Sequence, residues 1–324
     1  MAANKVETEA RITATSYAEI PENFRETVPF VCTDIKEIKA LFFCGERVIF
    51  YDACSFQRHS GLPSPERIIL TNFFKKRGAV IFITRCILME LAGERHILPK
   101  QIVDFMQALS DAGLRVVLFN EEHVRDILAE CFSSQKRINE YLLWAVRTVK
   151  TPVSSIMDAL KSDKKLYAAV IEGKNLKSSD LYQKFFAGAR GCKAHDDNPG
   201  EELLSVCLHV LANLPGLPAG KLCVVTDDKG AAGRIDSVMR KSGIQNPAAR
   251  IILYSTPKLV QHMYHEHDNL TWDNLVNLLS AGISGNITVM GFTPFDIAVQ
   301  EKISMSPRDL ARKITEPNGI SIVF

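Results

Sequence analysis

Two apolar, β-prone runs each end abruptly in carboxylates, and this feature constrains the fold more than any other. Val48–Tyr51 is followed by Asp52, and Leu222–Thr226 is followed by Asp227 and Asp228. Runs that are apolar throughout are typical of parallel strands buried on both faces. Folds built on such strands place their chemistry at the carboxyl ends of the strands. The sequence therefore predicts an α/β protein with an acidic pocket at one edge of its sheet.

Further strand-like runs alternate with helical periodicity. Residues 79–83, 114–119 and 250–254 are apolar and β-prone, and a helix that begins near Ser64-Pro65 lies between the first two strands of the chain. This alternation implies a parallel sheet with right-handed crossovers. The predicted fold class is α/β, a three-layer α/β/α arrangement with a central, mostly parallel sheet.

The same pattern suggests a division of the chain into three parts. Residues 1–40 are polar and interrupted by prolines, so we expect an N-terminal extension. Residues 41–260 carry the α/β pattern and contain a basic helical insertion at about 121–195. Within that insertion, residues 134–193 hold 12 Lys and Arg against 5 Asp and Glu, although the formal charge of the whole chain is only +2. We expect residues 261–324 to form a C-terminal extension that packs on the domain.

Composition bears on three questions: binding to nucleic acid, the state of the cysteines, and the presence of a membrane segment. The near-neutral total charge gives no global reason to expect nucleic acid as a partner, although the insertion provides a local basic surface that RNA could contact. The eight cysteines are scattered singly without a C-x-x-C pair, which favours buried free thiols in a reducing compartment. No signal peptide and no apolar run of about 20 residues is present, so we expect a cytoplasmic protein without a membrane segment.

Several acids at neighbouring strand ends require a compensating charge. Two carboxylates about 4 Å apart repel each other by about 4 kcal/mol at an effective dielectric near 20. Hard oxygen ligands of this kind suit Mg²⁺ or Mn²⁺, and such an ion can polarise a phosphate and activate a water. Metal-assisted hydrolysis of a phosphodiester is therefore the reaction that this set of acids predicts.

Four motifs in this order resemble those of the PIN-domain nucleases. They are Tyr51-Asp52-Ala53-Cys54 after a strand, Ile83-Thr84-Arg85-Cys86-Ile87-Leu88-Met89-Glu90-Leu91, Gly200-Glu201-Glu202 at the start of a helix, and Val225-Thr226-Asp227-Asp228. The resemblance covers roughly residues 45–260. It implies a PIN-like α/β/α fold whose acids bind Mg²⁺ or Mn²⁺ and cut RNA, through attack by a metal-bound water. It also implies a toxin-like endoribonuclease that forms a homo-oligomer.

The resemblance assigns metal ligands residue by residue. Asp52 corresponds to the first ligand and Glu90 to the second. Glu201 is the first choice for the third, with Glu202 and Asp197 as rivals. The fourth is Asp227 or Asp228, because the strand end favours the former and the pattern Thr-x-Asp favours the latter.

Other interpretations remain open at this stage. The polar residue that the family often has two places after its first Asp is here Cys54, and 111 residues separate Glu90 from Glu201. Asn198 and Glu201 also fit a helix capping box, which would explain Glu201 without any chemistry. A catalytically inactive PIN-like scaffold that binds RNA or a protein is therefore the alternative function. A phosphatase is less well supported, because Asp52-Ala53-Cys54 lacks a second acid.

Overall fold

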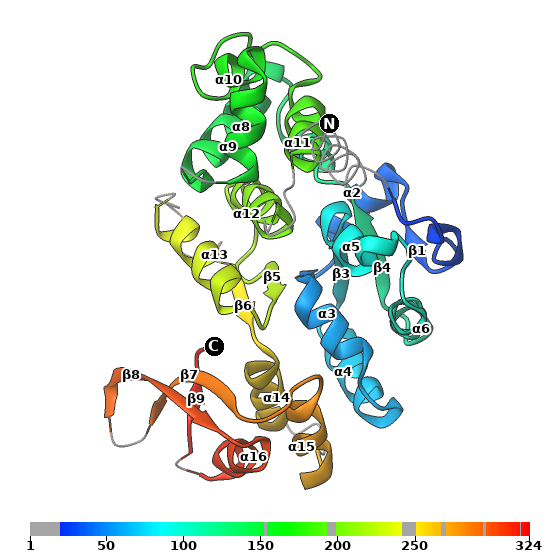
Figure 1. The fold of residues 1–324 in the computed structure, drawn as a ribbon, viewed down its shortest axis with the longest axis vertical. Helices are drawn as coiled ribbons and strands as arrows, with labels where there is room; N and C mark the ends of the chain where they lie inside the picture. Colours follow the sequence, from blue (N-terminus) through cyan, green and yellow to red (C-terminus); the bar gives the residue numbers. More distant parts are fainter. Residues whose placement is uncertain are drawn as a thin grey trace, which may run out of the picture.

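The computed structural model describes residues 20–151, 154–192, 199–241, 251–266, 270–293, 296–317 and 319–324. Its centre is a six-stranded sheet in which every pairing is parallel, in the order β1-β4-β3-β2-β5-β6. The strands are β1 (Val31–Cys32), β2 (Arg47–Tyr51), β3 (Ala79–Thr84), β4 (Arg115–Phe119), β5 (Leu222–Val225) and β6 (Ile252–Tyr254). The predicted α/β fold with a parallel sheet is confirmed, and the helices around the sheet are consistent with a three-layer α/β/α arrangement (Figure 1).

Helices connect the strands and form both ends of the molecule. They are α2 (Ile35–Cys44), α3 (Ala53–Ser60), α4 (Ser64–Lys76), α5 (Arg85–Ala92), α6 (Lys100–Asp111), α7 (His123–Cys131), α8 (Gln135–Val149), α9 (Ser155–Ser162), α10 (Lys164–Val170), α11 (Leu181–Gly191), α12 (Pro199–Ala212), α13 (Lys229–Lys241), α14 (Thr256–His265), α15 (Trp272–Ser280) and α16 (Pro307–Thr315), with 3-10 turns η1 (Phe24–Glu26) and η2 (Gly93–Arg95). In Figure 1 the insertion helices α8–α10 lie at one end of the molecule and α14–α16 at the other.

The order of the strands fixes the position of the site. From β2 the chain moves to β3 and β4 on one side, and it later returns to add β5 and β6 on the other side of β2. Tyr51 at the end of β2 is paired with Val225 at the end of β5. The connections leave these two neighbouring strands in opposite directions, which makes their carboxyl ends the topological switch point of the sheet. Ligands of open α/β sheets bind at such a point.

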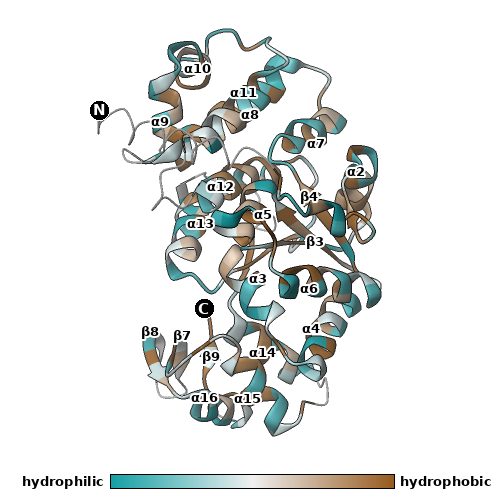
Figure 2. Cartoon of the chain, turned by 45° about the vertical axis from the view of Figure 1, so that its right-hand side comes forward, coloured by the Kyte–Doolittle hydropathy of each residue, from teal (hydrophilic) through white to brown (hydrophobic). Residues whose placement is uncertain are grey.

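Burial of apolar side chains holds the sheet in place. Phe50, Phe82 and Phe119 are fully buried on adjacent strands, and their rings pack at centroid distances of 5.3 to 5.8 Å. Figure 2 shows the same division, with hydrophobic strands at the centre and hydrophilic outer faces on the helices. Such aromatic contacts add to the roughly 25 cal/mol per Å² gained from burying apolar surface.

The sheet begins earlier in the chain than the sequence predicts. Val31–Cys32 pairs in parallel with β4, and helix α2 follows with Asp34 as its N-cap. Part of the predicted N-terminal extension (1–40) therefore belongs to the α/β domain. The sequence signal is weak because β1 is a two-residue edge strand.

The C-terminal part is a small α/β unit of its own. Strands β7 (Ile287–Thr293), β8 (Asp296–Met305) and β9 (Ser321–Ile322) form an antiparallel sheet in the order β8-β7-β9. Helix α14 crosses the predicted boundary at residue 260, and the Gln261 side chain exchanges hydrogen bonds with the backbone of Ile320 and Ile322. The unit is therefore joined to the α/β domain through a shared helix rather than by a free linker.

The insertion is helical, as predicted, and much of its charge is paired locally. Its cations form ion pairs with acids three or four residues away, as in Arg137–Glu140 and Lys184–Asp180. Of its aromatic residues, Tyr182, Phe185 and Phe186 are buried, whereas Trp144 is 40% exposed. Most of these rings therefore pack the inserted helices.

Two further expectations concern the cysteines and the membrane. All eight cysteines lie within the described residues and are free thiols. Cys86, Cys207 and Cys223 are buried as predicted, whereas Cys44, Cys54 and Cys131 are exposed. None of the helices in the described part of the chain has the length and apolar character that crossing a membrane requires.

Candidate active site

Asp52 lies at the centre of the carboxyl edge of the sheet. It follows β2, is 5% exposed, and caps helix α3 by accepting the N–H of Ala53 at 2.8 Å. Its other carboxylate oxygen accepts from the thiol of Cys54 at 2.8 Å and from the hydroxyl of Thr226 at 2.9 Å. Burial raises the pKa of Asp52, although these hydrogen bonds oppose the rise. Asp52 is thus both the N-cap of α3 and an acid at the carboxyl edge of the sheet.

The side chain of Glu90 contacts the start of α12. Thr84 caps α5, which carries Glu90 near its end, and the N–H of Gly200 donates to Oε1 of Glu90 at 3.2 Å. A Cβ atom at position 200 would lie 2.7 Å from Oε2 of Glu90. Glycine is therefore the residue that allows this carboxylate to approach the helix N-terminus.

Glu201 is the acid in closest electrostatic contact with the others. Burial raises its pKa to about 7, and the charges of Asp228, Asp52 and Glu90 add to the effect. The guanidinium of Arg234, 3.9 Å away, opposes the rise. Four carboxylates from four separate parts of the chain therefore form one group at the carboxyl edge of the sheet, with Arg234 as a partial counter-charge.

Glu202 and Asp197 were the rival candidates for the third acid. The carboxylate of Glu202 is directed elsewhere, since it pairs with Arg234 at 3.1 Å and accepts the N–H of Ile156 at 3.4 Å. Glu202 thus links α12 to α13 and α9. Asp197, and Asn198 of the possible capping box, lie outside the described residues.

The two acids after β5 have different surroundings. Asp227 accepts from the hydroxyl of Ser55 at 2.8 Å and from both the N–H and the hydroxyl of Thr256, at 2.7 and 2.6 Å. It also pairs with Arg58 at 2.9 Å. These bonds tie α3 to the start of α14, and they occupy both carboxylate oxygens of the predicted ligand Asp227.

Asp228 is the member of the pair that faces the group. Its side chain is exposed and accepts the N–H groups of Gly230 and Ala231 at the start of α13. Its own N–H donates to the Thr226 hydroxyl at 3.1 Å, and that hydroxyl in turn donates to Asp52. Thr226 therefore fixes the two acids relative to each other.

The group formed by Asp52, Glu90, Glu201 and Asp228 offers carboxylate oxygens to a metal ion. Carboxylate oxygens are the donors that Mg²⁺ and Mn²⁺ prefer. Within the described ranges, however, no three His, Cys, Asp or Glu side chains form a set that could hold a metal ion. Mg²⁺ often uses only one or two protein carboxylates and completes its coordination with waters and phosphate oxygens. The donor chemistry thus fits such an ion, without a closed protein cage.

Sequence reasoning missed the partners of these acids. Arg58 and Arg234 lie one to two helical turns after Asp52 and Asp228, and their spacing alone gives no signal. Glu121 follows β4 as Asp52 follows β2, so the same signal was present there. The structure buries Glu121 fully and pairs it with the buried Arg190 at 2.6 Å. This second acid anchors helix α11 of the insertion.

No family model, curated protein or solved structure matches the chain in comparisons with known proteins.

Proposed function

We propose that the chain is a PIN-like, metal-dependent endoribonuclease whose metal ligands come from Asp52, Glu90, Glu201 and Asp228. The observation that carries the proposal is the group of acids at the carboxyl ends of β2 and β5, where burial and then the charges of three neighbouring carboxylates raise the pKa of Glu201 to about 7. Strongly perturbed acids in a crevice are typical of functional sites. Asp227 has a structural role in this proposal.

The site residues have different roles in the proposed hydrolysis. Asp52, Glu90, Glu201 and Asp228 would supply one or two direct oxygen ligands and outer contacts to a Mg²⁺ or Mn²⁺ ion, and such an ion would supply positive charge at the scissile phosphate and lower the pKa of a bound water. Thr226 orients Asp52 and the backbone of Asp228. Burial and the neighbouring acids raise the pKa of Glu201 to about 7 in the metal-free protein, and a divalent cation bound beside it would favour its ionised form.

A direct test incubates the protein with single-stranded RNA in Mn²⁺ or in EDTA. We expect cleavage in Mn²⁺ that is abolished by EDTA and by Asp52→Ala. Cleavage that persists in EDTA, or that survives Asp52→Ala, contradicts the mechanism.

One observation favours the second candidate, an inactive scaffold. Both oxygens of Asp52 already accept hydrogen bonds, one of them from Cys54. A scaffold that does not bind metal predicts that Mn²⁺ leaves the melting temperature unchanged. A rise in Tm with Mn²⁺ that disappears in Asp52→Ala excludes it.

A further inference from the structure

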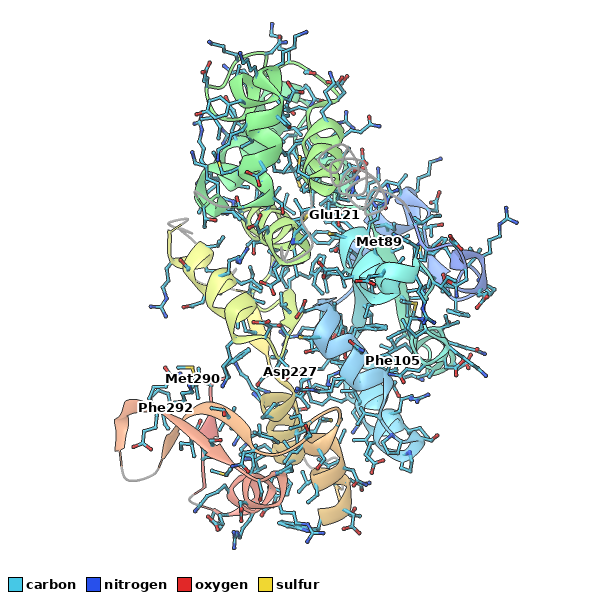
Figure 3. The ribbon with its side chains drawn as sticks, in the orientation of Figure 1. Met89, Phe105, Glu121, Asp227, Met290 and Phe292 are labelled. Carbon is cyan, nitrogen blue, oxygen red and sulfur yellow. The ribbon has the colours of Figure 1, made fainter. Side chains whose placement is uncertain are left out.

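Arg234 brings a positive charge to the edge of the acidic group. It lies on α13, which begins directly after Asp228 and packs against α12. In Figure 3 the labelled Asp227 marks the turn that leads from β5 into α13. The Arg234 side chain is 30% exposed, whereas that of Glu201 beside it is 11% exposed. The guanidinium therefore lies next to the acids and also reaches solvent, where a ligand can approach it.

One nitrogen of this guanidinium is anchored and another is not. Nη1 of Arg234 donates to Oε1 of Glu202 at 3.1 Å. Nη2 lies 3.9 Å from Oε2 of Glu201, which is too far for a hydrogen bond. A guanidinium carries five N–H donors, and in the parts of the chain that the structure describes Arg234 donates no hydrogen bond besides that to Glu202. Donors on the side of Glu201 are therefore available to a ligand.

The insertion helps to hold the anchored side. Glu202 is 8% exposed, and its second carboxylate oxygen accepts the N–H of Ile156 on α9 at 3.4 Å. A carboxylate that is buried and bonded through both oxygens restricts the guanidinium that it holds. Less conformational freedom is then lost when that guanidinium binds a ligand. Arg234 is thus preorganised beside the acidic group by Glu202, and through Glu202 by the insertion.

We propose that Arg234 contacts the scissile phosphate of the RNA, through the N–H groups that Glu202 does not use. Carboxylates alone repel a polyanion, and the planar fork of arginine matches two oxygens of one phosphate. When Glu201 serves a metal ion, its long contact with Arg234 weakens, which leaves Nη2 for the substrate. The inference rests on the proposed function of the acidic group, and it names a residue that holds the substrate there.

The test measures binding without cleavage. Fluorescein-labelled oligouridylate is titrated with the full chain in EDTA at several salt concentrations, and binding is followed by anisotropy. For Arg234→Gln, loss of one phosphate contact should reduce the slope of log K against log salt by about 0.7, so that binding weakens about fivefold more at 0.05 M than at 0.5 M salt. Arg240→Gln is the matched control, because it removes the same charge from the same helix, where Arg240 is 78% exposed and pairs with Asp236.

The outcomes separate this inference from the proposed function. A reduced slope in Arg234→Gln, with Arg240→Gln unchanged, supports the inference even if the protein cleaves no RNA in Mn²⁺. If Arg234 is only a counter-charge, Arg234→Gln lowers Tm and leaves the slope unchanged, which overturns the inference even if cleavage is intact. An equal change of slope in both variants, or failure of the unchanged protein to bind the oligonucleotide, also overturns it.

A second variant covers the case in which Arg234→Gln does not fold. Arg234→Lys keeps the positive charge and loses the fork that bonds Glu202 and a phosphate together. The inference predicts an unchanged salt slope with about threefold weaker binding. Affinity equal to that of the unchanged protein contradicts it.

Discussion

At the scale of single residues, the raised pKa of Glu201 makes stability depend on pH. Its pKa rises from 4.5 to about 7 on folding, so between these values the folded protein holds more protons than the unfolded chain. The free energy of unfolding therefore falls as pH rises through this window. We expect Glu201→Gln to stabilise the metal-free protein by about 1–2 kcal/mol near pH 8, after allowance for solvent screening, and to have little effect near pH 4. Urea denaturation in EDTA at both pH values measures this.

The adjacent glutamate is the control for this prediction. Glu202→Gln removes a carboxylate that pairs with Arg234 and accepts the N–H of Ile156. It should therefore destabilise the protein, by about 1–2 kcal/mol at neutral pH. Stabilisation by both variants, or by neither, would contradict the assignment of Glu201 to the acidic group.

The two aspartates after β5 give a second matched pair. Asp227→Asn should cost about 2–4 kcal/mol, since it weakens the bonds to Ser55 and Thr256 and leaves Arg58 without its charge partner. Asp228→Asn should cost less than about 1 kcal/mol, because asparagine also caps a helix, but it should abolish the rise in Tm with Mn²⁺. Thermal melts with and without Mn²⁺ distinguish the two. An unchanged Mn²⁺ response in Asp228→Asn would remove this residue from the site.

At the scale of elements, the approach of α12 to α5 depends on one glycine. Gly200→Ala places a methyl group 2.7 Å from Oε2 of Glu90, so that carboxylate must move. We expect the Mn²⁺-dependent rise in Tm to shrink or vanish while the fold is retained. Gly233→Ala on α13 is the control, because no neighbour lies within 4 Å of its added Cβ. It should stabilise the protein by about 0.5–1 kcal/mol and leave the Mn²⁺ response intact.

The insertion is held to the sheet by a buried ion pair. Arg190 on α11 contacts Glu121 and Glu122, and Glu121 also accepts the N–H of Cys86 at 2.8 Å. Arg190→Met leaves the Glu121 charge buried without its partner, which should cost about 3–5 kcal/mol. Adding Glu121→Gln removes that charge and keeps an acceptor for Cys86, so the double variant should recover part of the loss. A double-mutant cycle in urea measures the coupling, and simple additivity would show that the pair does not act as a unit.

Strands and helix caps with a strong local sequence pattern could be predicted. Hydrogen-bond and ion-pair partners that lie far apart in the sequence could not. The runs that became β2, β3 and β5 are fully apolar, and Thr84 is a helix cap in sequence and structure alike. The sequence analysis predicts no strand at β8, an edge strand in which apolar and polar residues are mixed. The choice between Asp227 and Asp228 could not be made from sequence, since it depends on Thr256, 29 residues away from Asp227. Likewise, Glu121 becomes structural only because Arg190, 69 residues further on, reaches it.

At the scale of the whole molecule, the distribution of charge sets where RNA is expected to lie. The central sheet, whose carboxyl edge carries the acidic group, lies in the middle of the molecule, whereas α10 lies at the far end of the insertion in both views (Figures 1 and 2). The excess charge of the insertion could still act on RNA over a distance, because electrostatic screening is weak at low ionic strength. The Debye length is about 30 Å at 0.01 M salt and about 8 Å at 0.15 M.

This difference in range yields the last prediction. Lys164→Gln/Lys165→Gln should weaken RNA binding measurably near 0.01 M salt but by less than about twofold near 0.15 M, because screening removes a long-range effect and not a direct contact. Anisotropy titrations across this range measure it. If the variant instead loses about 1.4 from the log–log salt slope, its lysines contact phosphates directly, and the strand runs over the insertion. The basic helices would then contact the RNA directly, rather than attract it only through long-range electrostatics.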